Sequence, residues 1–415
     1  MPPLLPLALA MLLGAPAPAR AADTEPTSQS LTTVVLAVLL VGAAYLLAHF
    51  VVDRLQRRFL VVTGAEYLFL GILLGPMVPE IPAFRDLTGV MPVIALAAGW
   101  VGLLRGMSFR FRALATSLPE LTTRIVLLHH LVPGIAVGLA AYSFLGLGWL
   151  GALSGREQAL ASAVLGCCAA ADATAPFDLL ARRYRIGGQT APMLRDAARL
   201  GDVLVIFVFG LVFCYFHPSV EGAAVDLRAA EWFLISLLLG GALGLLFTPF
   251  LGGDESGNAR FLALVGIIGF TSGAAYFLEL SPLFVNLILG VVLTNTARAR
   301  LKIRQTLDGT ERPMVLVLLI LAGALWRPSD TGTTLALLGL FASLRFVGKW
   351  VGSKIAAFGT TLRSDLYRGL LAHGEITVAM AVSMRVFFEG AAVDAAYTAI
   401  LLSVVLHDLI SPRML

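Results

Sequence analysis

Long apolar segments separated by short polar stretches make up nearly the whole chain. From residue 31 onward the apolar segments are mostly about 20 residues long, which is the length of a helix that crosses a bilayer. They fall at 31–52, 59–78, 88–106, 121–147, 157–181, 193–216, 230–250, 259–278, 282–298, 312–327, 333–356, 367–388 and 394–412. This pattern predicts an all-α membrane protein with about 13 transmembrane helices.

The amino-terminal segment follows a different pattern. An apolar run at 4–13 leads into Ala19-Arg20-Ala21, and a polar stretch follows at 22–30. This order predicts a secretory signal peptide over residues 1–21, although no positive charge precedes the apolar run. The alternative is an uncleaved anchor helix. In both interpretations the segment lies outside the fold.

Composition agrees with a membrane protein. Hydrophobic residues make up 58% of the 415 positions and charged residues 13%, and the mean hydropathy is +0.87. A soluble protein carries roughly 25% charged residues, so solubility throughout is excluded. The net charge of +4 comes from basic residues in short loops, which argues against a nucleic-acid surface. The three cysteines lie in apolar runs and show no metal-type spacing.

The basic residues are distributed unevenly between alternate loops. One set of loops holds Arg54, Arg57, Arg58, Arg110, Arg112, Arg182, Arg183, Arg185, Arg195, Arg260, Arg298, Arg300, Lys302, Arg304, Arg312, Lys354, Arg363 and Arg368. The other set holds Arg85, Arg156, Arg228, Arg327 and Arg385. The positive-inside rule assigns the first set to the cytoplasm. We therefore predict a multi-pass protein of the bacterial inner (plasma) membrane, with its N-terminus outside and its C-terminus in the cytoplasm.

The predicted helices divide into two halves of opposite orientation. Residues 31–216 form a first six-helix repeat, 230–250 a linking helix and 259–412 a second six-helix repeat. In each half the fifth helix is interrupted by polar residues and Gly or Pro, at 171–176 and at 372–375. Interruptions at corresponding positions of two halves indicate a transporter's binding site. The alternative is a proline kink in one helix and a glycine at a loop edge in the other.

Asp202 is the leading candidate for ion binding. It lies about nine residues into a helix that starts near Ala191, and the resulting rise of about 13 Å places it near the bilayer centre. A carboxylate at that depth is expensive, and it can either bind a cation through its oxygens or take up a proton. We predict that Asp202 is a ligand of a monovalent cation. The alternative is a salt bridge with Arg199.

Three further side chains lie at the two interruptions. Asp172 is a second acid that could share the ion site or pair with a cation, and the Thr174 hydroxyl is a candidate neutral ligand. Glu375, at the other interruption, could cap the half-helix or neutralise a buried arginine.

Two cations and two histidines also lie within predicted helices. Lys349 could pair with Asp202 or Asp172 when no ion is bound, and Arg345 lies one turn earlier. The alternative for Lys349 is snorkelling toward the cytoplasmic face. His129 and His130 are interpreted as histidines satisfied by neighbouring helices, with pH sensing as the alternative. No cofactor is predicted.

Several motifs together resemble the monovalent cation/proton antiporter superfamily, in particular Kef-type and bacterial sodium/proton antiporter membrane domains. The resemblance extends over about residues 31–412. The motifs that carry it are a Gly-Glu-x-Leu-type helix at 64–76, the first interruption at 169–176, Gly201-Asp202, the segment from Ser281 to Asn295, the Arg-x-x-x-Lys stretch at 345–352, and His373-Gly374-Glu375.

This resemblance implies an inverted-repeat fold with two crossing broken helices, usually in a homodimer, in which one domain forms the dimer contact and the other moves. It implies that Asp202 binds the ion and the proton and that Lys349 is its partner residue. The sequence departs from the family pattern at Gly201, where an acid is usual, and at Asp172-Ala173-Thr174. Many Kef-type members also carry a cytoplasmic nucleotide-binding domain, so regulation of that kind would need a separate cytoplasmic subunit here.

The leading functional hypothesis is exchange of Na⁺ or K⁺ for protons. Two alternatives stay open: sodium-coupled symport of an organic anion, and a membrane subunit that senses an ion without transporting it. No paired-aspartate protease signature, H-E-x-x-H motif or serine/histidine arrangement occurs in the spans, so we do not expect an enzyme.

Overall fold

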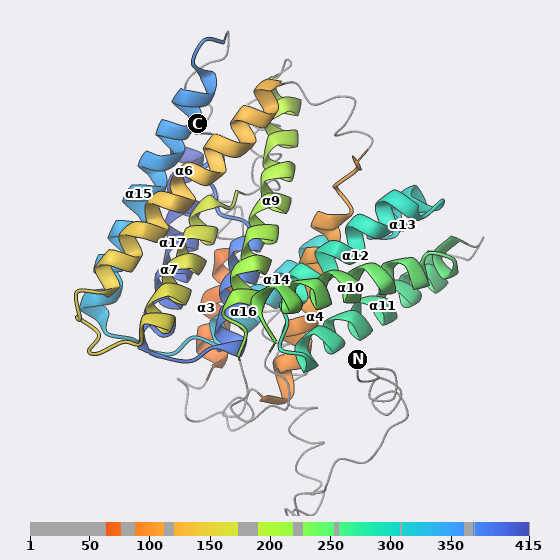
Figure 1. The fold of residues 1–415 in the computed structure, drawn as a ribbon, viewed down its shortest axis with the longest axis horizontal. Helices are drawn as coiled ribbons and strands as arrows, with labels where there is room; N and C mark the ends of the chain where they lie inside the picture. Colours follow the sequence, from red (N-terminus) through yellow and green to blue (C-terminus); the bar gives the residue numbers. More distant parts are fainter. Residues whose placement is uncertain are drawn as a thin grey trace, which may run out of the picture. The chain divides into compact units, whose positions relative to one another are not determined.

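A computed structural model describes most of the chain from residue 64 onward. The described residues are 64–75, 88–111, 120–172, 190–218, 227–252, 257–307, 309–360, 368 and 370–414. Every regular element among them is a helix (Figure 1). The predicted signal peptide at 1–21 and the first predicted helix at 31–52 lie outside the described residues.

The helices follow the apolar segments closely. They are α3 (Ala65–Leu74), η2 (Thr88–Val90), α4 (Met91–Gly106), α6 (Glu120–Leu145), α7 (Gly155–Ala170), α9 (Thr190–Tyr215), α10 (Ala229–Phe247), η3 (Phe250–Gly252), α11 (Gly257–Phe277), α12 (Pro282–Thr296), α13 (Arg300–Leu307), α14 (Glu311–Ala324), α15 (Thr331–Ala357), α16 (Glu375–Phe387) and α17 (Ala391–Met414). The short helix α13 was not predicted, because its eight residues are mostly polar and fall in a sequence stretch that reads as a loop.

Membrane-spanning character is strong in several of these helices. Within the described residues, six are long and apolar enough to cross a membrane: parts of α6, α9, α10, α11, α15 and α17. Two shorter helices, α4 and α12, are also apolar. This is the character of a multi-pass membrane protein. The predicted number of about 13 spans and the predicted repeats at 31–216 and 259–412, joined by the linking helix at 230–250, stay predictions.

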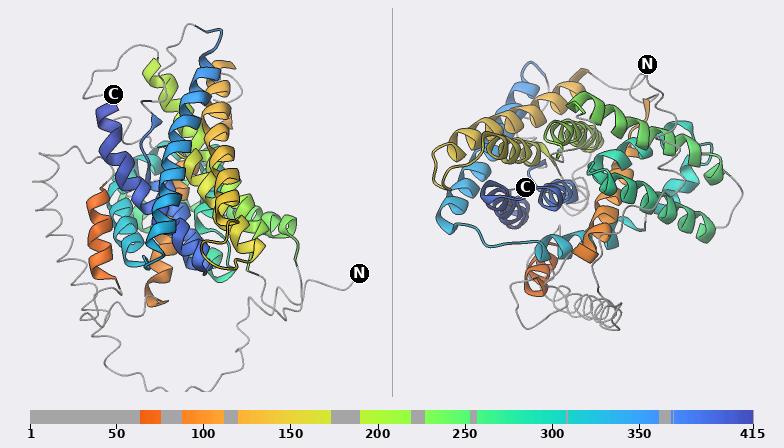
Figure 2. Two further views of the ribbon diagram at one scale, coloured as in Figure 1. Left: turned by 90° about the vertical axis from the view of Figure 1, so that its left-hand side faces the viewer. Right: turned by 60° about the horizontal axis from the view of Figure 1, so that its bottom comes forward.

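Contacts between helices fall into two groups. In the first, which we call the site group, α6 packs along α15 and α7, and α17 packs against α15, α16 and α7 (Figures 1 and 2). In the second, which we call the support group, α4 packs against α11, α12 and α14, while α3 packs on α14 and α10 on α12. Helices α9 and α16 each contact several members of both groups, and α17 of the site group also contacts α3. Side chains on α9 and α16 therefore lie where the site group and the support group meet.

The support group contains two unusually close helix pairs. A Cβ atom added at Gly71 of α3 would lie 1.9 Å from the Ile320 carbonyl oxygen of α14, and one added at Gly102 of α4 would lie 2.1 Å from the Leu283 carbonyl oxygen of α12. Backbones this close leave no space for a side chain, which is the usual role of small residues between membrane helices. These pairs are fixed by backbone packing.

Candidate functional site

The two predicted interruptions are where two helices end and begin. Helix α7 stops at Ala170, and Ala171 is extended, with φ −63° and ψ 146°. Helix α16 starts at Glu375 after Gly374, which is also extended, with φ −118° and ψ −178°. The interruptions predicted at 171–176 and 372–375 agree with this, because the chain is non-helical over the described residues 171–172 and 371–374. Thr174 lies outside the described residues.

A single buried arginine binds both interruptions. The Arg345 guanidinium, on α15, donates to the Ala171 carbonyl oxygen at 2.9 Å and to the Leu371 carbonyl oxygen at 2.5 Å. A longer contact reaches the Ala372 oxygen at 3.4 Å. Carbonyl groups freed from a helix must find donors within the protein at this depth. Arg345 supplies those donors on both sides.

Lys349 lies one turn along α15 and pairs with Asp172. Its ammonium donates to Asp172 Oδ1 at 2.5 Å and to the Ala170 carbonyl oxygen at 3.3 Å. Both charged side chains are fully buried. Of the two acids considered as partners for Lys349, the structure therefore brings it to Asp172. Because the ammonium is buried, snorkelling of Lys349 is wrong.

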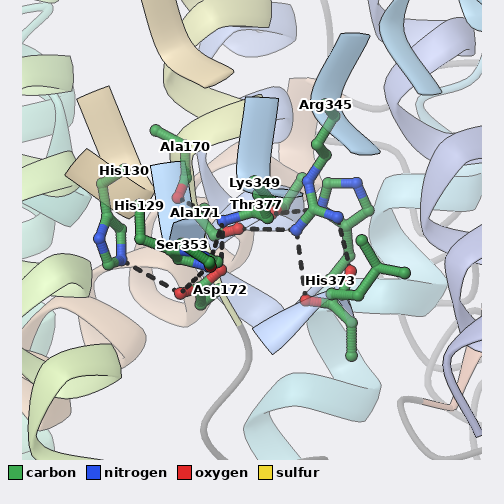
Figure 3. A network of polar contacts seen from close by, with 12 residues as sticks. His129, His130, Ala170, Ala171, Asp172, Arg345, Lys349, Ser353, His373 and Thr377 are labelled. Atoms are coloured by element: carbon green, nitrogen blue, oxygen red, sulfur yellow. Dashed lines mark hydrogen bonds and ion pairs between the residues drawn. The ribbon is translucent and has the colours of Figure 1, made fainter. Parts of the chain in front are cut away.

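Two histidines of α6 face the second oxygen of Asp172 (Figure 3). His130 Nε2 lies 3.2 Å and His129 Nε2 3.5 Å from Asp172 Oδ2. His129 Nδ1 lies 3.0 Å from Ser353 Oγ, and His130 Nδ1 donates to the Val126 carbonyl oxygen at 2.7 Å. Since that carbonyl can only accept, the proton of neutral His130 is on Nδ1 and a lone pair on Nε2 faces the carboxylate. No role at Asp172 was predicted for these histidines.

Asp202, on α9, has a very different environment. Its side chain is 0% exposed, and apart from an electrostatic contact with the Asp172 backbone amide, neither carboxylate oxygen has a hydrogen-bond partner among the described residues. The charges that act on it through space belong to Arg105, Asp172 and Lys349. Arg199, the predicted alternative partner, instead contacts Asp196 at 3.8 Å. A buried carboxylate without a partner is unusual and calls for a proton or a cation.

Gly201 makes room for one of the histidines beside Asp202. A Cβ atom at position 201 would lie 1.8 Å from His130 Nε2 and 2.0 Å from His130 Cε1. The imidazole therefore packs directly on the α9 backbone at the residue before Asp202. This explains why the chain has glycine at a position where the resembling family has an acid. His130 links the surroundings of Asp172 to those of Asp202.

Sequence reasoning missed Arg105, the last charged residue of α4. Its side chain is 9% exposed, and the guanidinium forms an ion pair with Glu375 at the start of α16. Its Nη2 atom also donates to Glu311 Oε1 at 2.8 Å, at the start of α14. Glu375 thus neutralises a buried arginine, which was one of its two predicted roles. An arginine just before the end of an apolar run is typical of a loop boundary, so its role could not be predicted from its position in the sequence.

No set of three or more His, Cys, Asp or Glu side chains in the described ranges is arranged to hold a metal ion. The arrangement that is present has unpaired acceptor atoms close to buried cations. Asp172 Oδ2, His130 Nε2 and both Asp202 oxygens are buried acceptors with no hydrogen-bond donor among the described residues. Such a site can hold one more positive charge, either a proton or a small cation.

Comparison with solved structures identifies the architecture. The sodium/proton antiporter MjNhaP1 from Methanocaldococcus jannaschii, in a structure at pH 8, aligns over 92% of this chain and 96% of its own with a TM-score of 0.61. The chain has the fold of a sodium/proton antiporter. A second structure of MjNhaP1, from electron microscopy, aligns over 91% of this chain and 94% of its own with a TM-score of 0.58. The sequences are 18% and 14% identical in the two alignments.

The antiporter fold confirms the resemblance that the motifs indicated, at the level of the fold. Comparison of the sequence with protein-family models and with curated proteins finds no match. The functional roles of Asp202, Asp172, Lys349, Arg345, Arg199 and Glu375 stay predictions. Their positions are now defined by the geometry above.

Proposed function

We propose that the protein is a secondary active transporter that exchanges a monovalent cation, Na⁺ or K⁺, for protons across the bacterial inner membrane. One observation carries the proposal: the Asp202 carboxylate is fully buried and has no hydrogen-bond partner among the described residues. A charged acid at bilayer depth costs about 2.5–3.5 kcal/mol even on insertion scales. That cost is removed when the carboxylate takes a proton or binds a cation.

The two forms exclude each other, and this makes exchange the natural outcome. A proton on a carboxylate oxygen removes the negative charge that attracts the metal ion, and a bound metal ion expels the proton. If Asp202 faces each side of the membrane in turn, a cation gradient in one direction drives protons in the other.

Asp172 and Lys349 act as the second element of the site. In the absence of a cation, Lys349 neutralises Asp172 at 2.5 Å. A cation that binds near both acids weakens this pair by competing for the same oxygens. Thr174, two residues beyond Asp172, is proposed as a neutral ligand. Arg345 keeps the two interruptions together while the pair rearranges.

The remaining expectations are part of the same proposal. The chain would contain a signal peptide over 1–21 and two inverted six-helix repeats, at 31–216 and 259–412, with a linking helix at 230–250. The two repeats are supported by two similar close helix pairs, α3 on α14 and α4 on α12, each of which joins one helix of each repeat. It would form a homodimer, have its C-terminus in the cytoplasm, and receive any nucleotide-dependent regulation from a separate subunit.

Exchange is tested in proteoliposomes that contain a fluorescent pH probe. We expect Na⁺ or K⁺ to dissipate a preset proton gradient with the wild-type protein, and Asp202→Asn to reduce the rate at least 100-fold. Asp196→Asn is the matched control, because it removes an acid of the same helix whose side chain is 63% exposed. Wild-type exchange in Asp202→Asn vesicles would refute the role of Asp202.

Of the two alternatives, symport of an organic anion is disfavoured by the arginines. The guanidinium of Arg345 is used by backbone carbonyls, and that of Arg105 by two glutamates. Neither is available for a substrate carboxylate in this arrangement. A sensor that does not transport predicts calorimetric cation binding without flux, which the vesicle assay separates from exchange.

A further inference from the structure

We infer that Glu375 is a positioning residue, whose function is to hold the Arg105 guanidinium away from the Asp202 carboxylate. The inference rests on the proposed function, since it concerns access of the cation to Asp202. It adds a device to the site that neither the motifs nor the comparisons assign.

Arg105 is fixed by two carboxylates from two different helices. Its guanidinium contacts Glu375 in the first turn of α16, directly after the second interruption. It also contacts Glu311 at 2.8 Å in the first turn of α14. The Glu375 side chain is only 7% exposed, whereas that of Glu311 is 39% exposed. Screening by solvent therefore weakens the Glu311 contact, and Glu375 is the stronger partner.

The guanidinium also lies within electrostatic range of the ion-binding acid. The positive charges of Arg105 and Lys349 both act on Asp202 through space. Helix α4, which carries Arg105, contacts both α9 and α16. The Arg105 guanidinium is thus a buried cation whose charge acts on two buried acids from different helices. It pairs with one of them, Glu375, and leaves Asp202 without a hydrogen-bond partner among the described residues.

An arginine on Asp202 would stop the exchange cycle. A guanidinium stays protonated under all physiological conditions and binds carboxylates through two parallel hydrogen bonds. A lysine can release its proton, but an arginine paired with Asp202 would compete permanently with the transported cation. Confinement of Arg105 is therefore a condition for cation binding, and Glu375 provides the stronger part of it.

The central experiment compares Glu375→Gln with the double variant Glu375→Gln/Arg105→Gln in full-length protein in proteoliposomes. Loss of the Glu375 charge releases Arg105 toward Asp202. We expect the cation KM to rise about 10- to 100-fold, the range of one charge-assisted hydrogen bond, with the maximal rate retained. In the double variant the competing guanidinium is gone, and KM returns to within about threefold of the wild type.

Two further variants serve as controls. Glu311→Gln removes the more exposed carboxylate, and we expect KM to change less than threefold because Glu375 still holds Arg105. Glu375→Asp keeps the charge, and we expect it to restore most of the affinity that Glu375→Gln loses. A purely structural glutamate would lower the amount of folded protein and the maximal rate, but arginine removal would not rescue it.

A wild-type KM in Glu375→Gln would overturn the inference, and so would a double variant no better than Glu375→Gln. A cryo-electron microscopy structure of Glu375→Gln tests the same point without transport. We expect the guanidinium within hydrogen-bonding distance of Asp202, and an unmoved Arg105 would overturn the inference. Absence of exchange by the wild type would refute the proposed function alone, because the position of Arg105 in the variant is still measured.

Discussion

The end of α7 and the middle of α9 each bury one aspartate completely, but they treat it in opposite ways. Asp172 is surrounded by Lys349, His129 and His130 within 3.5 Å. Asp202 has no hydrogen-bond partner for either oxygen among the described residues. Equal burial therefore does not mean equal energetics. Lys349 pairs with the first carboxylate, whereas the second has no such partner among the described residues.

This difference suggests a division of labour. A buried acid that is paired contributes to the stability of the site, because removal of its partner leaves an uncompensated buried charge. An acid without a partner contributes little to stability and is free to change its state. The contrast can be tested by removing the partners one at a time and comparing stability with transport.

The largest effect is expected from Lys349→Met. This variant leaves Asp172 buried without its cation, and breaking a buried pair in this way costs about 3–5 kcal/mol. Asp202→Asn removes no partner, and we expect it to change stability by less than about 1 kcal/mol. Thermal unfolding in detergent measures both. The double variant Lys349→Met/Asp172→Asn should regain most of the loss, and equal stabilities of the two single variants would break the comparison.

A smaller effect is expected where the two acids are linked. Gly201→Ala would place a methyl group against the His130 ring, and overpacking of this kind costs about 1–3 kcal/mol. The second substitution His130→Ala removes the clash, so the double variant should be more stable than Gly201→Ala alone. Gly241→Ala in α10 is the matched control, because no atom lies within 4 Å of its added Cβ. An equally large loss of stability in Gly241→Ala would contradict the explanation that Gly201→Ala clashes with His130.

How far the site follows from sequence differs from residue to residue. Apolar segments predicted the helices well, since bilayer length and hydropathy are local properties of the chain. Asp202 and Lys349 were found because a charge within an apolar segment is conspicuous. The interruptions at 171–176 and 372–375 were found for a similar reason, through glycine, proline and polar residues at matching places.

The partners of the buried charged residues could not be predicted from the sequence. Lys349 pairs with a residue 177 positions away, and Arg105 with one 270 positions away (375 minus 105). Helical spacing fixes neighbours three or four residues apart but not contacts between helices. The contact of His130 with Gly201 likewise depends on how α6 crosses α9. That Gly201 leaves space for the His130 imidazole can be recognised only from the three-dimensional structure.

The smallest effect on stability is expected from an aspartate that has hydrogen-bond partners but is exposed to solvent, in contrast to the two buried aspartates. Asp330 precedes α15, outside the span, and hydrogen bonds from the Thr333 hydroxyl and amide lower its pKa below the usual 3.8. A lowered pKa means that this contribution to stability is complete above the usual pKa and is lost as pH falls through the lowered value. The Asp330→Asn variant should lack this loss of stability in acid unfolding of the detergent-solubilised protein. A pH profile identical to that of the wild type would contradict the role of Asp330 as the N-cap of α15.

The shared use of Arg345 by the two interruptions has a mechanical consequence. Ala171 and Leu371 accept hydrogen bonds from the same guanidinium, so separating these two backbone segments would strand buried carbonyl oxygens. The end of α7 and the start of α16 are therefore expected to move as one rigid unit. In the proposed exchange, an ion bound at Asp172 would move together with these two helix ends.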